Sequence, residues 1–357
     1  MFRKRSRHVR VTRIVTFGSI SAVLLSCLTV QGVGHAQITN GSVVHSHPSH
    51  TVSHRAFQKT SPKNPWNPDL VGRRYKMTYE TVDGVSETLY VFEPEIPVYK
   101  QAPVVVYLHG GFLMHGSAVI GYDNQNYNPH DWIISHIEAG LVSHGFVFVT
   151  VNYRLAPAFR WPAQLIDAKT AIRFLRAHAT ELNIDQNRIG VMGDSAGGGL
   201  ANFVGLTGRL AGYDQGLWSN QSSAVSAVVD MFGPSTRKLF ALHWLSTHGD
   251  SPNPVFGLYT PYTIQRESAI SYTGHHDPPF LILQGKKDTV EPPYQSIELY
   301  RRLLSMGDRA QLILIQNSQH EFHAVGGPLW PTIPMLSQDV ISFFEQTLAG
   351  YRLYTGS

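Results

Sequence analysis

The sequence predicts an α/β fold with a mostly parallel central sheet, antiparallel strands at its N-terminal side and helices on both faces. Short, nearly all-apolar segments rich in β-branched and aromatic residues recur along the chain, as is typical of strands buried on both faces. Segments with apolar residues at helical spacing separate them, and this alternation favours a parallel sheet. Asp83-Gly84, between two strand-like segments, predicts an opening hairpin because its turn needs positive φ angles.

The expected elements can be placed along the chain in order. One catalytic domain is expected over residues 66–350, with an irregular, lid-like insertion at about 232–276. The hairpin strands are expected at 75–82 and 86–92, and the buried strands at 104–108, 146–151, 189–192, 225–231, 280–283 and 312–315. Helices are expected at 162–178, 200–210, 294–306 and 335–348.

The first 36 residues have the pattern of a secretory signal peptide. A basic head precedes an uncharged, mostly apolar run at 14–30, and the small residues Gly34 and Ala36 follow. We expect cleavage near Ala36 and a secreted or periplasmic protein without stable membrane insertion. The alternatives are an uncleaved anchor, for which the Ser, Thr and Gly residues make a poor span, and a lipoprotein modified at Cys27. Residues 37–65, rich in Ser, Pro, Asn and His, are expected to form a flexible linker.

Charge and cysteine content exclude several classes of function. Six of the 29 Lys and Arg residues, and none of the 25 Asp and Glu residues, precede residue 37, which leaves 23 basic against 25 acidic residues. The basic charge therefore belongs to the export signal, and no nucleic-acid partner is expected. Cys27 is the single cysteine and lies in the predicted signal, so a cysteine nucleophile and a thiolate metal site are excluded. No metal or cofactor site is expected.

Ser195 is the predicted nucleophile. The segment Gly193-Asp194-Ser195-Ala196-Gly197 directly follows an expected strand and precedes the expected helix 200–210. A serine on such a tight turn is held in a strained conformation that small neighbours permit, and its place at a helix N-terminus favours developing negative charge. The alternative is a glycine-rich packing turn. Gly197-Gly198-Gly199 does not have the spacing of a dinucleotide-binding loop.

A base and an orienting acid are expected later in the chain. A serine hydroxyl becomes a good nucleophile only when a base removes its proton, and in this topology the order is Ser, acid, His at the ends of successive strands. Asp288 closely follows one expected strand and His320 the next. We predict that His320 is the base and that Asp288 fixes its tautomer. His323 is the rival base and Asp230 the rival acid.

Three backbone N–H groups are predicted to form an oxyanion hole. One belongs to Ala196, the residue after the nucleophile. The others are assigned to Gly111 and Phe112, in the loop His109-Gly110-Gly111-Phe112 after the strand 104–108, where glycines let the backbone approach a substrate. A plain turn is the alternative for this loop.

With these motifs in place, the chain resembles the hormone-sensitive-lipase-like branch of α/β hydrolases, nearest to bacterial feruloyl and acetyl-xylan esterase-like proteins. The resemblance covers about residues 75–345 and implies the α/β-hydrolase fold and cofactor-independent hydrolysis of carboxylic esters through an acyl-enzyme. Its markers are His109-Gly-Gly, Asn152-Tyr-Arg-Leu-Ala-Pro157, Trp161-Pro-Ala, Asp167-Ala, Gly193-Asp-Ser-Ala-Gly-Gly198, Pro278-Pro-Phe-Leu-Ile-Leu-Gln-Gly285, Asp288 and Gln295-Ser.

The chain departs from the family pattern at three places. Phe112 replaces a third glycine, and Glu321 replaces the glycine that usually follows the histidine. Strands are expected where typical members have an N-terminal helical cap, so the cleft is expected to be more open.

The expected function is a secreted serine hydrolase of feruloyl, acetyl or other short-chain esters, either small molecules or groups linked to a polymer. The alternatives are a serine peptidase of the same fold and a non-catalytic binding protein.

Overall fold

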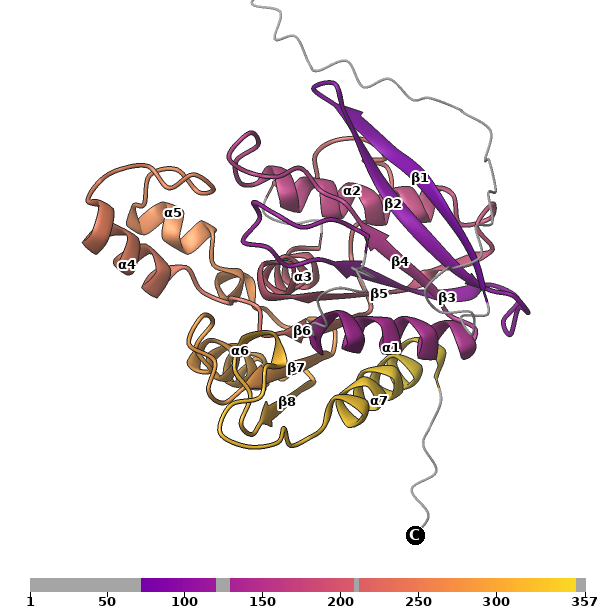
Figure 1. Ribbon diagram of the computed structural model, residues 1–357. Coiled ribbons are helices and arrows are strands. Elements are labelled where there is room, and N and C mark those ends of the chain that lie inside the picture. Colours follow the sequence, from indigo (N-terminus) through magenta and orange to yellow (C-terminus); the bar gives the residue numbers. More distant parts are fainter. Residues whose placement is uncertain (1–71, 120–128, 209–211, 351–357) are drawn as a thin grey trace, which may run out of the picture. The chain divides into compact units, whose positions relative to one another are not determined.

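Eight strands form one sheet in the computed structural model, in the order β1-β2-β4-β3-β5-β6-β7-β8 (Figure 1). The model describes residues 72–119, 129–208 and 212–350, so the predicted signal segment and linker lie outside the described residues. The pairs β1–β2 and β2–β4 are antiparallel and the other pairs are parallel, which confirms the predicted sheet. The strands are β1 (Gly72–Val82), β2 (Val85–Pro94), β3 (Ala102–Leu108), β4 (Val147–Val151), β5 (Ile184–Asp194), β6 (Ala227–Met231), β7 (Phe280–Gly285) and β8 (Ala310–Ile315).

The hairpin and the far edge of the sheet differ in how well the sequence predicts them. Asp83 and Gly84 have φ angles of 52° and 78°, as the predicted turn between β1 and β2 requires. The prediction that every later strand is buried on both faces is wrong for β8. In β8 only Ile315 is fully buried, because β8 is the last strand of the sheet and pairs with β7 alone.

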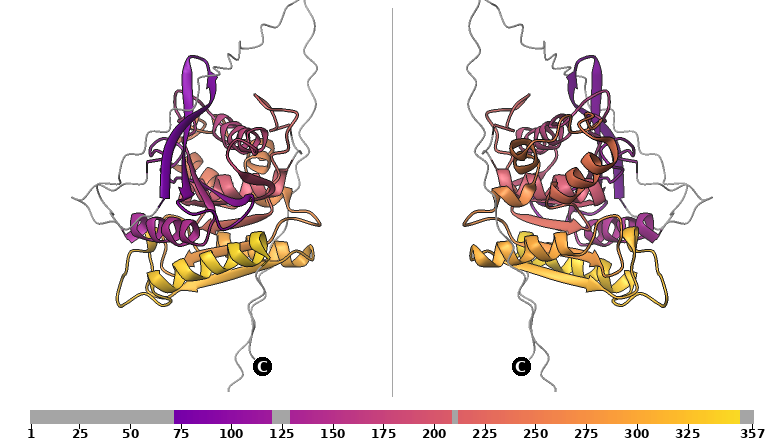
Figure 2. Two further views of the ribbon diagram at one scale, coloured as in Figure 1. Left: turned by 90° about the vertical axis from the view of Figure 1, so that its right-hand side faces the viewer. Right: turned by 90° about the vertical axis from the view of Figure 1, so that its left-hand side faces the viewer.

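Helices cover both faces of the sheet, as predicted. α1 (Pro129–Ser143), which the sequence reasoning did not assign, and α7 (Ile333–Phe344) lie side by side on one face (Figures 1 and 2). α2 (Ala163–Ala177), α3 (Ser195–Thr207) and α6 (Tyr294–Ser305) contribute to the core on the opposite face. None of the helices in the described ranges has the length and hydropathy needed to cross a membrane.

The sheet separates two hydrophobic cores, and β3 contributes to both. Its residues alternate between them because successive side chains of a strand point to opposite faces. One core receives Val104, Val106 and Leu108, and the other receives Val105 and Tyr107. All seven residues of β3 are buried, so this strand is a well-packed support for the loop that follows it.

The segment between β6 and β7, expected to be an irregular insertion, contains two helices. They are α4 (Lys238–His248) and α5 (Pro261–Arg266), followed by a short 3-10 helix, η1 (Ala269–Tyr272). Thr260 caps α5, and its side chain accepts from the N–H of Thr263 at 3.1 Å. Ala241 is the one buried residue of α4, so this helix contributes little to the core. Its role as a lid stays a prediction.

Candidate active site

Ser195 lies at the junction between β5 and α3, in a sharply turned backbone. Its φ angle is 48°, in the left-handed region that a non-glycine residue occupies at a cost of about 1–2 kcal/mol. The turn leaves no room for larger neighbours. A Cβ on Gly193 would lie 2.3 Å from the carbonyl oxygen of Gly197, and one on Gly197 would lie 2.1 Å from that of Leu108. The small residues of the motif therefore permit the strained turn that presents Ser195.

Asp194 connects this turn to β3 and to the loop that follows β3. Its Oδ1 accepts a hydrogen bond from the hydroxyl of Tyr107 at 2.6 Å. A Cβ on Gly110 would lie 2.2 Å from Asp194 Oδ2, so the two segments are in close contact. The nucleophile turn and the glycine-rich loop are thus fixed relative to each other.

The three residues predicted as a triad form a hydrogen-bonded row. His320 Nε2 lies 3.0 Å from Ser195 Oγ, and His320 Nδ1 lies 2.8 Å from Asp288 Oδ2. Because an ionised carboxylate only accepts hydrogen bonds, Nδ1–H donates to Asp288 and Nε2 is left to accept from the serine hydroxyl. The imidazole side chain is 15% exposed, so it is shielded but not sealed from solvent. This arrangement can activate Ser195 by general base catalysis.

The carboxylate of Asp288 is held by several donors. Its Oδ1 accepts from the backbone N–H groups of Val290 and Glu291, both at 2.9 Å. The amide nitrogen of Gln284 lies 3.4 Å from Oδ2. These bonds fix the orientation of the Asp288 side chain toward His320. Sequence reasoning missed Gln284, although an amide that ends an apolar strand was a usable signal.

Aromatic packing positions the imidazole from the side. Phe232, directly after β6, contacts the ring of His320 edge-on at a centroid distance of 4.8 Å. Phe322 packs on Phe232 at the same distance and is fully buried. Sequence reasoning missed Phe232 because an aromatic residue after a strand has no local mark of such a contact.

The structure places the rival residues outside the row. The side chain of His323 is 52% exposed, and its Nε2 lies 3.5 Å from Glu321 Oε2. Asp230 is fully buried and accepts from Asn202 Nδ2 at 2.8 Å and from Gly233 N at 2.7 Å. Burial raises the pKa of Asp230 to about 7. Its hydrogen bonds connect β6 to α3 and to the segment after β6, and none of them involves the imidazole.

The loop after β3 presents two backbone donors. The φ angles of Gly111 and Phe112 are 107° and 56°, and their N–H groups have no hydrogen-bond partner within the described ranges. The carbonyl oxygen of Gly111 accepts from the N–H groups of Met114 and His115, both at 2.9 Å, which fixes the loop. Ala196 lies in the first turn of α3, where N–H groups lack an intrahelical acceptor. The assignment of these donors to an oxyanion hole stays a prediction.

Two departures from the family pattern coincide with left-handed backbone. Phe112 and Glu321 stand where glycine is usual in the resembled family, and their φ angles are 56° and 55°. Glycine adopts this region without a steric penalty, whereas other residues do not. The Phe112 side chain is 57% exposed at the same turn.

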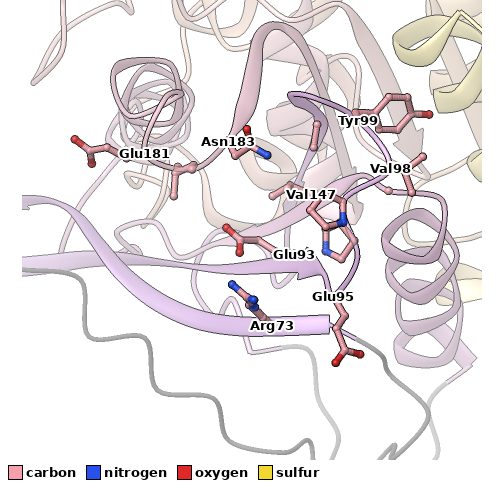
Figure 3. A pocket seen from close by; sticks show the side chains of 13 residues that line it. Arg73, Glu93, Glu95, Val98, Tyr99, Val147, Glu181 and Asn183 are labelled. Atoms are coloured by element: carbon pink, nitrogen blue, oxygen red, sulfur yellow. The ribbon is translucent and has the colours of Figure 1, made fainter.

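A cavity of about 190 Å³ lies at the end of the sheet where β3 and β4 begin (Figure 3). It is lined by Ala102 and Val147, at the amino ends of β3 and β4, with Glu93, Glu95 and Arg73 around it. Ser195 instead follows the carboxyl end of β5, so this cavity is not part of the candidate site. No cluster of three or more His, Cys, Asp or Glu side chains suited to a metal ion occurs in the part of the chain that the structure describes.

Comparisons with known proteins identify relatives over about two thirds of the chain. The BD-FAE family model matches residues 72–303. Esterase LipC of Mycobacterium tuberculosis is 30% identical over 252 residues, which are 69% of this chain and 59% of LipC. The acetylxylan esterase of Xylanibacter ruminicola is 24% identical over 248 residues, which are 69% of this chain and 46% of that protein. The chain thus spans between about half and three fifths of the length of these relatives.

Solved structures show the same fold. The native form of the esterase Est2 from Thermogutta terrifontis aligns with a TM-score of 0.61 at 19% identity, covering 82% of this chain and 98% of that chain. At that identity the likeness concerns the fold alone. The fold is that of the α/β hydrolases, as the sequence motifs predict.

Proposed function

Because the chain belongs to the BD-FAE family, we propose that it is a serine hydrolase that cleaves carboxylic esters. One observation carries the proposal. Ser195, His320 and Asp288 form a hydrogen-bonded row, and the loop that carries Gly111 and Phe112 contacts the nucleophile turn through Gly110 and Asp194. The similarity to an esterase and an acetylxylan esterase supports the same reaction class.

In the proposed reaction, Ser195 Oγ attacks the ester carbonyl carbon while His320 Nε2 takes the hydroxyl proton. The imidazolium then gives that proton to the leaving alcohol oxygen as the C–O bond breaks, which leaves an acyl-enzyme. Water repeats the sequence and releases the acid. Asp288 keeps the Nδ1–H tautomer in place and stabilises the imidazolium, and its bonds to backbone N–H groups hold it in position for this role.

Each tetrahedral intermediate carries a negative oxygen. We assign its stabilisation to the N–H groups of Gly111, Phe112 and Ala196. Donors that are already oriented cost no reorganisation during the reaction, and loss of one typically lowers the rate by about 10²–10³-fold. Support comes from the fixed loop geometry at Gly111, where a Cβ would lie 2.3 Å from the carbonyl oxygen of His115.

The proposed substrates are feruloyl, acetyl or other short-chain esters, including esters linked to a polymer. The relationship to an acetylxylan esterase supports this class. The predicted signal segment also leads us to propose that the enzyme acts outside the cytoplasm. N-terminal sequencing of the protein recovered from a culture supernatant tests export, and recovery of the intact basic head inside cells would contradict it.

A panel of acetyl, butyryl, octanoyl and feruloyl esters, run on the wild type and on Ser195→Ala, tests the function. We expect the wild type to turn over the short esters and Ser195→Ala to lose at least about 10³-fold in kcat. A fluorophosphonate probe should label the wild type only. Preference for an aminoacyl anilide would instead indicate a peptidase, and an unlabelled Ser195 would indicate a binding protein.

A further inference from the structure

Arg237, between β6 and α4, is a buried cation without a hydrogen-bonded acceptor. The residue is 8% exposed, and no described residue accepts a hydrogen bond from its guanidinium or forms an ion pair with it. The ring of Phe256 covers one face of the guanidinium, at 4.2 Å from Cζ to the ring centroid. An arginine stays protonated in proteins, and buried donors that lack an acceptor are costly. The N–H groups therefore need an acceptor from solvent or from a bound molecule.

The backbone around Arg237 is tied to the proposed catalytic row. Gln295 Oε1 accepts from the N–H groups of residues 235 and 236, at 3.0 and 2.9 Å. Gln295 Nε2 donates to Glu291 Oε2 at 2.7 Å, and the N–H of Glu291 donates to Asp288 Oδ1 at 2.9 Å. This chain of hydrogen bonds links the backbone before Arg237 to the carboxyl group that orients His320. Glu291 also interacts electrostatically with both Arg237 and His320. Arg237 thus belongs to the surroundings of the proposed catalytic row.

Three titratable groups face Arg237, namely Glu291, Tyr259 and Glu267. Glu267 is buried, and its Oε2 and the Tyr259 hydroxyl have no hydrogen-bond partner among the described residues. Burial raises the pKa of Glu267 and of Glu291 to about 7 each and raises the pKa of Tyr259 above its ordinary value. Below pH 7 all three groups are therefore mostly neutral and able to donate, and the guanidinium is the fixed charge among them.

Further charges act on the two glutamates. Arg266 is exposed and lowers the pKa of Glu267, against the larger effect of burial. His320 also lowers the pKa of Glu291, whereas Asp288 and Asp230 raise it. As pH rises through about 7, both glutamates ionise and the region around Arg237 loses its net positive charge.

We propose that Arg237 is a specificity-determining residue that binds a carboxylate carried by the ester substrate. The proposal rests on the proposed function and names a substrate class for the same site. A guanidinium offers in-plane N–H groups in a fork that matches both oxygens of a carboxylate, and the Cζ atom of Arg237 lies over the ring of Phe256. Unpartnered donors and a fixed buried cation together favour an anionic acceptor.

Binding to the Ser195→Ala variant tests the proposal without any need for turnover. The probes are neutral phenyl acetate, monophenyl succinate, with a carboxylate on the acyl side, and 4-acetoxybenzoate, with one on the alcohol side. By isothermal titration calorimetry at pH 6, we expect one anionic probe to bind more tightly than phenyl acetate. Adding Arg237→Met should lower the affinity for that probe by about 10–100-fold, the usual effect of losing a charge-assisted hydrogen-bond pair. The affinity for phenyl acetate should not change. The anionic probe that binds more tightly shows whether Arg237 contacts the acyl side or the alcohol side of the ester.

Matched variants separate this role from general effects of charge or folding. Arg301→Met removes one exposed cation from α6 and should change neither affinity. Arg237→Lys keeps the buried charge but loses the forked pair of N–H donors, so it should still lower the affinity for the anionic probe several-fold. Affinity for that probe should fall from pH 6 to pH 8, and Glu267→Gln should reduce this fall. His320 is present in both proteins of that last comparison, so its titration does not account for the difference.

Equal binding of the anionic and neutral probes, or equal losses for both in Arg237→Met and Arg237→Lys, would overturn the proposal. Wild-type turnover of phenyl acetate is measured separately. Loss of the proposed function would show as absent turnover even where the anionic preference depends on Arg237. Failure of the specificity proposal would show as normal turnover with no such preference.

Discussion

Two groups of buried carboxyl side chains differ in how many N–H groups donate hydrogen bonds to them. Asp288 accepts hydrogen bonds from two backbone N–H groups and from His320. Glu80, on β1, is 3% exposed and receives no hydrogen bond from any N–H group in the described ranges. Its neighbours Glu87, Asp167 and Arg154 complete what we call the hairpin cluster.

Within the hairpin cluster, one carboxylate takes nearly all the donors. Arg154 donates to Asp167 from its backbone N at 2.8 Å and from its guanidinium at distances down to 2.6 Å. Burial, and then the charge of Asp167, raise the pKa of Glu80 to about 8. The same causes raise the pKa of Glu87 to about 7.

The difference teaches how N–H donors are shared among the buried carboxyl groups. Two backbone N–H groups donate to one oxygen of Asp288 and fix its orientation toward His320. Glu80 receives no such donor from the described residues, and burial raises its pKa to about 8. The donors at the site thus hold the orienting carboxyl group in place, while the hairpin cluster makes stability depend on pH.

The largest expected effect comes from removing the charge at the site. Asp288→Asn keeps the shape but no longer fixes the Nδ1–H tautomer of His320, so kcat on phenyl acetate should fall by about 10³–10⁴-fold. Steady-state kinetics and urea unfolding of the same sample measure activity and stability. Glu80→Gln is the control and should keep kcat within about 3-fold of the wild type. A loss smaller than 10-fold in Asp288→Asn would contradict the role of the row.

The next effect concerns the one strong cation of the hairpin cluster. Arg154→Met leaves Asp167 buried without its partner, which should lower the free energy of unfolding by about 3–5 kcal/mol at pH 7. Urea unfolding measures the change, and Arg301→Met on the surface is the matched control. The loss should be smaller at pH 5, because burial raises the pKa of Asp167 and removal of the Arg154 charge raises it further, which favours protonation of Asp167 as pH falls. An equal loss at both pH values would show that packing rather than charge is responsible.

Glu80 itself should make stability fall as pH rises. Because its pKa is raised from 4.5 to about 8, the folded state binds more protons than the unfolded state between these values. The contribution is therefore fully present below about pH 4.5 and is lost as pH rises toward 8. Glu80→Gln should be more stable than the wild type by about 2–4 kcal/mol at pH 8 and nearly equal to it at pH 4. Parallel pH profiles of the two proteins would refute this account.

The smallest effect tests the strained backbone beside His320. Glu321 has φ 55° and ψ 24°, so Glu321→Gly should raise the free energy of unfolding by up to about 1 kcal/mol. Its exposed contact with His323 contributes little that would be lost. Thermal unfolding measures the gain, with activity on phenyl acetate as the check that the row is intact. A destabilised variant would show that the glutamate makes contacts that outweigh the strain.

The sequence by itself determined the succession of strands along the chain, the nucleophile turn and the positions of His320 and Asp288 after successive strands. These features have local signatures, because runs of apolar residues, the spacing of glycines and the turn at Asp83 depend only on neighbouring residues. The half-exposure of β8 escaped the same reasoning, since its apolar run does not reveal that it pairs with one strand only.

Only the tertiary structure decided how the distant segments meet. The bond between Ser195 and His320 joins residues 125 positions apart, and the edge-on contact of Phe232 depends on the order of β6, β7 and β8. The raised pKa of Glu80 and the lack of an acceptor for the Arg237 guanidinium among the described residues have the same origin. Each depends on which donors, acceptors and charges reach a buried group in space, and such contacts leave no period or spacing in the chain.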